Sequence, residues 1–121
     1  MEISLDWLNR QKPGNTAKFL NLEYVETKGD IYILKATFPN ETTNPMNMVQ
    51  GGMITAALDD ATAMVVISAY NFEIGPLTTD LHVLFHRPVA VGEALIEVRI
   101  IKLGKKLATV EGKLFNSENK L

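Results

Sequence analysis

One segment of this 121-residue chain limits its possible folds more than any other, the stretch MITAALDDATAMVVISAY that follows Gly51-Gly52. Much of one side of this stretch is small or apolar, at Ala56, Ala63 and Val66. Another set of small or apolar residues recurs at helical spacing: Ile54, Ala57, Leu58, Ala61, Met64, Val65 and Ser68. A helix that is apolar on nearly every side belongs in the middle of a structure, so other elements must surround it.

The segments around this helix have the alternating pattern of half-buried strands. Two predicted strands precede the helix, over residues 19–27 and 31–38, and the turn signal Lys28-Gly29-Asp30 joins them. Three follow it, over residues 77–87, 94–103 and 106–115, and Gly104-Lys105 supplies the turn between the last two. We also expect a short helix over residues 5–11, with Ser4 as its N-cap, and an ordered loop over residues 39–50.

This order of elements predicts an α+β fold in which an antiparallel sheet curls around one central helix. The sheet would cover the apolar surface of the helix, and each strand would keep a polar outer face. A chain of this length is expected to form a single domain, residues 1–121.

The charge and composition of the chain exclude several classes of function. The formal net charge is −2 and there is no long run of Lys or Arg, so nucleic-acid binding is not expected. The absence of cysteine excludes disulfides, thiolate catalysis and Cys-ligated zinc. The opening residues MEISLDWLNR do not resemble a signal peptide, and the longest apolar run, AMVVIS, is far shorter than the roughly 20 residues that span a bilayer. We therefore expect a cytoplasmic protein without a membrane partner.

Gly51-Gly52 begins the long predicted helix. Backbone N–H groups there lie at the positive end of the helix dipole, with no side chain in the way. Such groups can polarise a carbonyl and stabilise the oxyanion that forms during acyl transfer. A flexible joint between loop and helix is the alternative, and the glycine pair alone favours that alternative.

Asp59 and Asp60 are adjacent acids in this largely apolar helix. A buried carboxylate is costly without partners, so the pair needs an explanation. Their helical neighbours are mostly small, which lets a ligand or another chain approach closely, and partial desolvation would suit a carboxylate to act as base or nucleophile. Alternatively, at least one of them faces solvent or a Thr hydroxyl. The residues alone do not choose between the two acids.

Asp80, His82 and His86 share one face of the predicted strand over residues 77–87. At about 3.3 Å per residue, His82 and His86 are roughly 13 Å apart. A shared zinc would require both within about 2.1 Å of the metal. We therefore expect no metal site and regard both histidines as interface or surface residues.

The concentrated cations after the helix are Arg87 and the cluster of Arg99, Lys102, Lys105 and Lys106. These side chains can meet the phosphates of a coenzyme A tail. A solvated sheet face and hairpin tip is the alternative.

The stretch NPMNMVQGGMITAALDDA resembles the signature of the phenylacetate-degradation (PaaI-like) acyl-CoA thioesterases, which have the hotdog fold. That signature has Asn or Gln, then His-Gly-Gly six residues on, and an acidic residue nine residues after the His. Asn44, Gln50-Gly51-Gly52 and Asp59 have this spacing. The stretch TTDLHVLFHRPVAVGE is also similar to the family's pattern, with its Arg-Pro and its Gly-Glu turn. The resemblance covers about residues 40–116.

The resemblance implies a catalytic role for four residues. Asp59 would act as general base or nucleophile at the thioester carbon, which distinguishes it from Asp60. The Gly51 N–H and the Asn44 amide would polarise the carbonyl oxygen, and Thr78 would help to hold the carboxylate or water. Substrate contacts are expected from a second set: Gln50, Gly52, Arg87, Lys105 and Lys106.

The function that the resemblance implies is hydrolysis of an acyl-CoA to free acid and CoA, without metal or redox cofactor. Coenzyme A enters only as part of the substrate. The family's active sites lie at a dimer interface, with Asp59 contributed by one subunit and the Gly51 region by the other. Tetramers made from two such dimers are common in the family.

The chain departs from the family pattern in two places. Gln50 stands where the family usually has His, which keeps hydrogen bonding but removes acid–base capacity, so substrate positioning or rate would change. The chain also stops at Leu121, where these folds usually continue into one more strand, so the last strand is very short or the sequence is a shortened piece.

Gln50 bears on two alternatives to the thioesterase. A hotdog hydratase or dehydratase would need the catalytic His that Gln50 replaces. A non-catalytic acyl-CoA-binding or regulatory module is made more credible by the same replacement.

Overall fold

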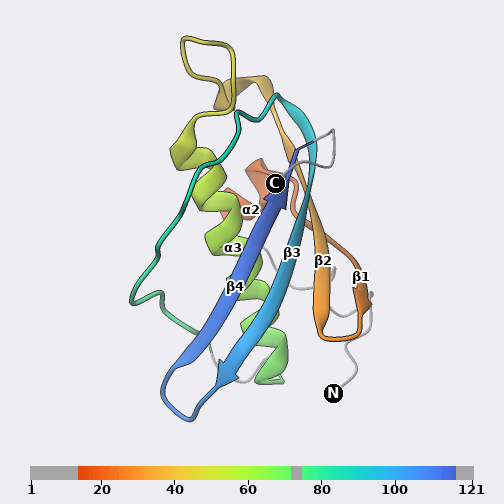
Figure 1. Cartoon of the computed structure of the whole chain (residues 1–121), viewed down its shortest axis with the longest axis vertical. Coiled ribbons are helices and arrows are strands. Elements are labelled where there is room, and N and C mark those ends of the chain that lie inside the picture. Colours follow the sequence, from red (N-terminus) through yellow and green to blue (C-terminus); the bar gives the residue numbers. More distant parts are fainter. Residues whose placement is uncertain (1–13, 72–74, 117–121) are drawn as a thin grey trace.

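A four-stranded antiparallel sheet packs against one long helix in the computed structural model, which describes residues 14–71 and 75–116 (Figure 1). The sheet has the order β1-β2-β3-β4, and the helix is α3, Gly51–Ala69. The strands are β1 Glu23–Lys28, β2 Ile31–Phe38, β3 Gly92–Leu103 and β4 Ala108–Phe115. This architecture confirms the predicted α+β hotdog fold.

The core lies between the inner face of the sheet and one face of α3. Leu34 on β2 and Ile96 on β3 are fully buried cross-strand partners at its centre. On the helix, Ala57, Ala61 and Val65 are fully buried, at the spacing of one helical face. Because two of these three side chains are methyl groups, the helix axis can lie close to the sheet.

The contact between α3 and β4 depends on Gly112. A Cβ atom at this position would lie 3.1 Å from the Thr62 Cγ2 and 3.2 Å from the Leu58 Cδ2. These separations are tighter than ordinary van der Waals contact, so a larger residue would push the helix away from the strand. The glycine thereby sets the position of the helical turn that carries Asp59.

The strand predicted over residues 19–27 is wrong at its start. Residues 15–19 form helix α2, Asn15–Phe19, and β1 begins only at Glu23. Asn21, in the left-handed region at φ 52°, ends the turn, and the Leu22 N–H donates to the Ala17 carbonyl. Asn tolerates this conformation better than most residues, which is why the helix can stop there. The helix predicted over residues 5–11 lies outside the described residues.

The prediction of a strand over residues 77–87 is also wrong for the single chain. This segment runs beside α3 without hydrogen-bonded pairing to any described strand (Figure 1). Its apolar side chains are largely exposed: Leu77 by 89%, Leu84 by 70% and Phe85 by 56%. The alternating pattern is real, but the described chain covers only part of the apolar surface that it produces.

The described sheet therefore ends at β4. The further strand after residue 115 that the family pattern implies would begin at the edge of, or beyond, the described residues. The other predicted elements agree with the structure. Helix α3 spans the expected range, and the two hairpins turn at Gly29, which has φ 63°, and around Gly104.

Helix α3 is more apolar as a whole than the short run AMVVIS indicates. Its mean hydropathy of 1.4 over 18 residues suffices, by length and composition, for a membrane-spanning helix, although core helices of soluble proteins pass the same test. Here one face of the helix packs on the sheet, but only 33% of that window is buried. A substantial part of the small and apolar surface of α3 thus faces away from the sheet.

Truncation of Leu34 tests this account of the core. We expect Leu34→Ala to lower the free energy of unfolding by about 2–5 kcal/mol, because it leaves a cavity between sheet and helix. The matched control is Leu95→Ala, on a neighbouring strand, where the side chain is 39% exposed. This control should change stability by no more than about 0.5 kcal/mol. Urea unfolding followed by circular dichroism, at one protein concentration, measures both; equal losses would contradict the assignment of faces.

Candidate active site

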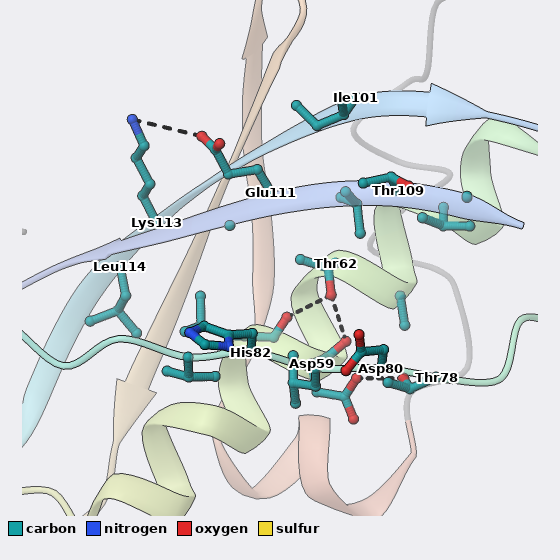
Figure 2. Close-up of a pocket in the computed structure, with 18 of the residues that line it drawn as sticks. Asp59, Thr62, Thr78, Asp80, His82, Ile101, Thr109, Glu111, Lys113 and Leu114 are labelled. Carbon is teal, nitrogen blue, oxygen red and sulfur yellow. Dashed lines mark hydrogen bonds and ion pairs between the residues drawn. The ribbon is translucent and has the colours of Figure 1, made fainter.

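Asp59 and Thr78 meet at the side of α3 (Figure 2). The Thr78 hydroxyl donates to the Asp59 Oδ1 at 2.7 Å, although the two residues are 19 positions apart in the sequence. The next turn of the helix is held locally, because the Thr62 hydroxyl donates to the backbone carbonyls of Leu58 at 2.8 Å and Asp59 at 3.1 Å. The carboxylate is therefore oriented by one hydroxyl and keeps further lone pairs for a substrate or water.

The neighbouring acid has a different partner. The Thr16 hydroxyl on α2 donates to the Asp60 Oδ2 at 2.6 Å. This contact links α2 to α3 and accounts for Asp60 as a structural carboxylate that faces a Thr hydroxyl. The two adjacent acids thus point to different sides of the helix, and only Asp59 reaches the side where the residue 77–87 segment runs.

A cleft of about 760 Å³ adjoins Asp59. It lies between α3, β4 and the residue 76–87 segment, and Figure 2 shows Asp59, Thr62, Thr78 and His82 around it. Its volume is within the roughly 300–1,000 Å³ of typical small-molecule sites. Lys105 and Lys106, predicted to contact substrate phosphates, line the end formed by the β3–β4 hairpin.

The N-terminus of α3 carries unpaired donors. Gln50 is its N-cap, and the Met53 N–H donates to the Gln50 Oε1 at 3.1 Å. Within the part of the chain that the structure describes, the N–H groups of Gly51 and Gly52 donate to no protein acceptor. A Cβ at Gly52 would lie 2.7 Å from the Gln50 Oε1, so the glycine makes room for the cap. Two backbone donors are therefore free at the positive end of the helix dipole.

Asn44 lies near this helix start with its amide oxygen occupied. The Asn44 Oδ1 accepts from the backbone N–H groups of Met46 at 2.9 Å and Met48 at 3.1 Å. These bonds fix the orientation of the amide, and among the described residues its Nδ2 has no acceptor. The Asn44 Nδ2 is thus a third donor, held in place by the loop that precedes α3.

Asn44 and Gly51 share a second, smaller cavity of about 580 Å³. Arg87 lines this cavity and also the larger cleft. Phe85 forms one wall, and its ring carbons would lie 3.5 Å from a Cβ on Gly51. The segment that carries Thr78 to Asp59 therefore also carries an aromatic ring to the helix N-terminus, a contact that the sequence analysis missed because it treated the segment as a regular strand.

The structure brings the predicted catalytic residues together in two groups, not one. Asp59 joins Thr78 at the larger cleft, and Gly51 joins Asn44 at the smaller cavity. Asp59 lies eight positions after Gly51 in the helix, which is about 12 Å along the axis. Gln50 and Gly52 line neither cavity, since the Gln50 side chain folds back over the helix start.

The methionines divide between the smaller cavity and the core. Met46 and Met48 line the smaller cavity, whereas Met53 and Met64 pack against the core. Within residues 14–71 and 75–116, no three His, Asp or Glu side chains are grouped closely enough to hold a metal ion. The expectation of a metal-free site remains a prediction.

A model of the thioesterase superfamily matches residues 46–121, and the chain belongs to that superfamily. An inferred thioesterase from Ralstonia eutropha JMP134, a phenylacetic acid degradation-related protein, has 26% identity and a TM-score of 0.82, over 91% of this chain and 86% of that one. The PaaI protein of the E. coli phenylacetic acid degradation operon has 17% identity and a TM-score of 0.72, over 86% and 74%. An inferred esterase of Saccharolobus solfataricus is 25% identical over 103 residues, which are 85% of this chain and 68% of its own length. The predicted resemblance to PaaI-like thioesterases is confirmed.

Substitution of Gly51 by proline tests the backbone donor directly. Proline is tolerated at the first helical position, and Gln50, at φ −66° and ψ 139°, already has the extended conformation required before proline. Gly51→Pro therefore removes the N–H with little disturbance of the helix, and we expect kcat for thioester hydrolysis to fall about 10²- to 10³-fold.

The matched control is Gly51→Ala, which keeps the N–H. Its Cβ would meet the Phe85 ring at the ordinary contact distance of 3.5 Å, so most of the activity should remain. Steady-state rates of thiol release, with circular dichroism to verify helix content, distinguish the two variants. Equal rates for Gly51→Pro and Gly51→Ala would exclude this N–H as the carbonyl donor.

Proposed function

We propose that this protein is an acyl-CoA thioesterase that hydrolyses its substrate to a free carboxylic acid and CoA. The observation that carries the proposal is the Asp59 carboxylate, held by the Thr78 hydroxyl at 2.7 Å beside a cleft large enough for a small molecule. Membership of the thioesterase superfamily supports the reaction type. A thioesterase-fold protein of Streptococcus pneumoniae, 16% identical with a TM-score of 0.73, was solved with coenzyme A, which supports the class of substrate.

The proposed reaction needs one carboxylate and a set of neutral donors. As a general base, Asp59 takes a proton from water while the water oxygen bonds to the thioester carbon. As a nucleophile, Asp59 itself bonds to that carbon and water later cleaves the resulting anhydride. In both routes the carbonyl oxygen becomes an oxyanion that the Gly51 N–H and the Asn44 Nδ2 stabilise. As the carbonyl re-forms, the C–S bond breaks and CoA leaves as a thiolate, which takes the proton held by Asp59 in the first route or a proton from water in the second.

Two copies of the chain are needed to complete this site. A base and an oxyanion donor must each lie about 3 Å from atoms of the same carbonyl or its attacking water. Gly51 and Asp59 of one chain are about 12 Å apart along the helix, which is too far. We therefore propose a homodimer in which Asp59 of one subunit faces the Gly51 region of the other.

The exposed apolar surface supports a dimer. Leu77, Leu84 and Phe85 are more than half exposed on a segment without strand partners, and most residues of α3 are only half-buried. A second copy would cover both surfaces, and the extended segment 77–87 can pair with its own copy across a two-fold axis. The finer proposal, from the family pattern, is a tetramer made of two such dimers in the cytoplasm.

The cations at the cleft are proposed to hold the nucleotide part of the substrate. Lys105 and Lys106 line the larger cleft, and Arg87 lines both cavities. All three side chains are exposed, so they can meet phosphates without loss of a buried partner. Gln50 contributes the N-cap and no acid–base chemistry, since its amide does not titrate.

Replacement of each acid in turn tests the assignment of the base. We expect Asp59→Ala to abolish thiol release from acyl-CoA substrates, because the reaction loses the group that activates water or attacks carbon. Asp60→Ala is the matched control: it removes the contact with Thr16 and should keep activity within a few-fold of the unchanged protein. Thiol release followed with a chromogenic disulfide measures both.

Full activity of Asp59→Ala would contradict the mechanism. The non-catalytic alternative predicts a different result, in which the unchanged protein binds acyl-CoAs tightly in calorimetry and releases no thiol at any chain length.

A further inference from the structure

The β3–β4 hairpin projects at one end of the molecule, beside the end of α3 (Figure 1). The Gly104 N–H donates to the Leu107 carbonyl at 2.9 Å across the turn, and the Gly104 carbonyl accepts from the Tyr70 hydroxyl. A Cβ at Gly104 would lie 2.7 Å from the Leu107 carbonyl oxygen, so this closure requires glycine. The hairpin tip, residues 101–107, is thus held both across its turn and against the helix.

Positive charge is concentrated at this tip. Between residues 98 and 110 the chain has four cations and no Asp or Glu, although its formal net charge is −2. One of the four, Arg99, lies opposite Glu111 in the sheet. The other three are exposed and have no ion pair among the described residues: Lys102, Lys105 and Lys106.

The other lysines of the strands are arranged differently. Lys28, Lys35 and Lys113 each pair with a glutamate, at 3.8, 3.6 and 3.7 Å. Their charges are therefore largely balanced within the sheet, whereas the charges of the hairpin tip are not. An anionic partner that meets the tip has no internal ion pair to break.

Large aliphatic side chains are exposed between the lysines of the tip. Ile101 is exposed by 52%, Leu103 by 44% and Leu107 by 67%. Single exposed apolar residues are normal on a protein surface, but three within seven residues form a patch. Ile101 and Leu107 also border the larger cleft, whereas Leu103 lies outside it. The tip thus combines aliphatic side chains with unpaired ammonium groups.

An anionic lipid surface matches this combination. Each lysine near such a surface increases binding about fivefold, and neighbouring aliphatic side chains enter the boundary between headgroups and acyl chains. A specific protein partner covers about 800 Å² and about 20–30 residues of the surface that it binds. The patch at the tip is confined to seven residues, and it projects from the molecule (Figure 1). A bilayer therefore fits it better than a second protein.

We propose that the hairpin tip docks this protein on an anionic lipid bilayer. Leu103 and Leu107 lie in the headgroup region, and the ammonium groups of the three lysines meet lipid phosphates. The expectation of no membrane partner was based on the lack of a signal peptide and of a long apolar run, and docking on a surface needs neither. The docking goes beyond the proposed hydrolysis and does not depend on it.

Sedimentation with vesicles tests the docking. At about 0.1 M salt, we expect the unchanged protein to bind vesicles of phosphatidylcholine mixed equally with phosphatidylglycerol, and not vesicles of phosphatidylcholine alone. Lys102→Glu should weaken this binding at least fivefold and Leu103→Asp at least tenfold, because neither charge reversal nor a carboxylate suits the anionic surface. These two residues serve for the test because neither lines the larger cleft. No binding of the unchanged protein would overturn the proposal.

The matched controls change the same types of side chain away from the tip. Lys18→Glu alters an exposed lysine of α2, a helix that contacts α3 at Asp60, about 15 Å along the axis from Tyr70. Leu95→Asp alters a leucine of β3 that is exposed by 39%. Both should bind the anionic vesicles within about twofold of the unchanged protein, since charges beyond a Debye length from the bilayer are screened. Equal weakening by the controls and by the tip variants would contradict docking through the tip.

A fluorescent label locates the tip without a change of charge. The chain has no cysteine, so Leu103→Cys and Leu95→Cys each accept a single environment-sensitive dye. On anionic vesicles the dye at residue 103 should shift its emission to the blue, and the dye at residue 95 should not. An unshifted dye at residue 103 would overturn the proposal. A change of oligomeric state in Leu103→Asp, measured by light scattering, would overturn it in favour of a contact between copies of the chain.

Discussion

The structure depends on the burial of one helix that is apolar on nearly every side. Ala57, Ala61 and Val65 give α3 a flat face that the sheet can approach closely, and Gly112 allows the closest contact with β4. This contact places Asp59 beside the cleft between helix, sheet edge and the following extended segment. The same packing leaves most residues of α3 outside the sheet contact only half-buried, since one sheet cannot surround a helix. The proposed second copy of the chain would cover the apolar surface of the helix that the sheet does not reach.

Most of the fold could be predicted from the sequence, because the local conformational preferences of its segments agree with the way these segments pack. The β2 pattern over residues 31–38 and the helix from Gly51 to Ala69 are confirmed in type and range. Helix α2 was missed because its five residues lack a helical period long enough to recognise, and only Asn21 marks its end. The segment 77–87 alternates like a strand, but strand pairing needs a neighbour that the described chain does not supply.

Less of the candidate site than of the fold could be predicted from the sequence. Physical reasoning found a helix N-terminus and a pair of acids, and the family spacing then selected Asp59 over Asp60. The structure gives an independent reason for that choice, because Asp59 borders the larger cleft, whereas Asp60 is bonded to Thr16 and does not line it. The role of Gln50 as N-cap was not foreseen, since the sequence cannot indicate which way a side-chain amide will turn.

Complementation between two inactive chains tests the shared active site most directly. One chain carries Asp59→Ala and the other Gly51→Pro, and the two are refolded together in equal amounts. If Asp59 of one subunit works with Gly51 of the other, each mixed dimer contains one intact site. With half of the dimers mixed, about one quarter of the unchanged activity should return. Mixed dimers that are present by mass spectrometry yet release no thiol would contradict a site built from two chains.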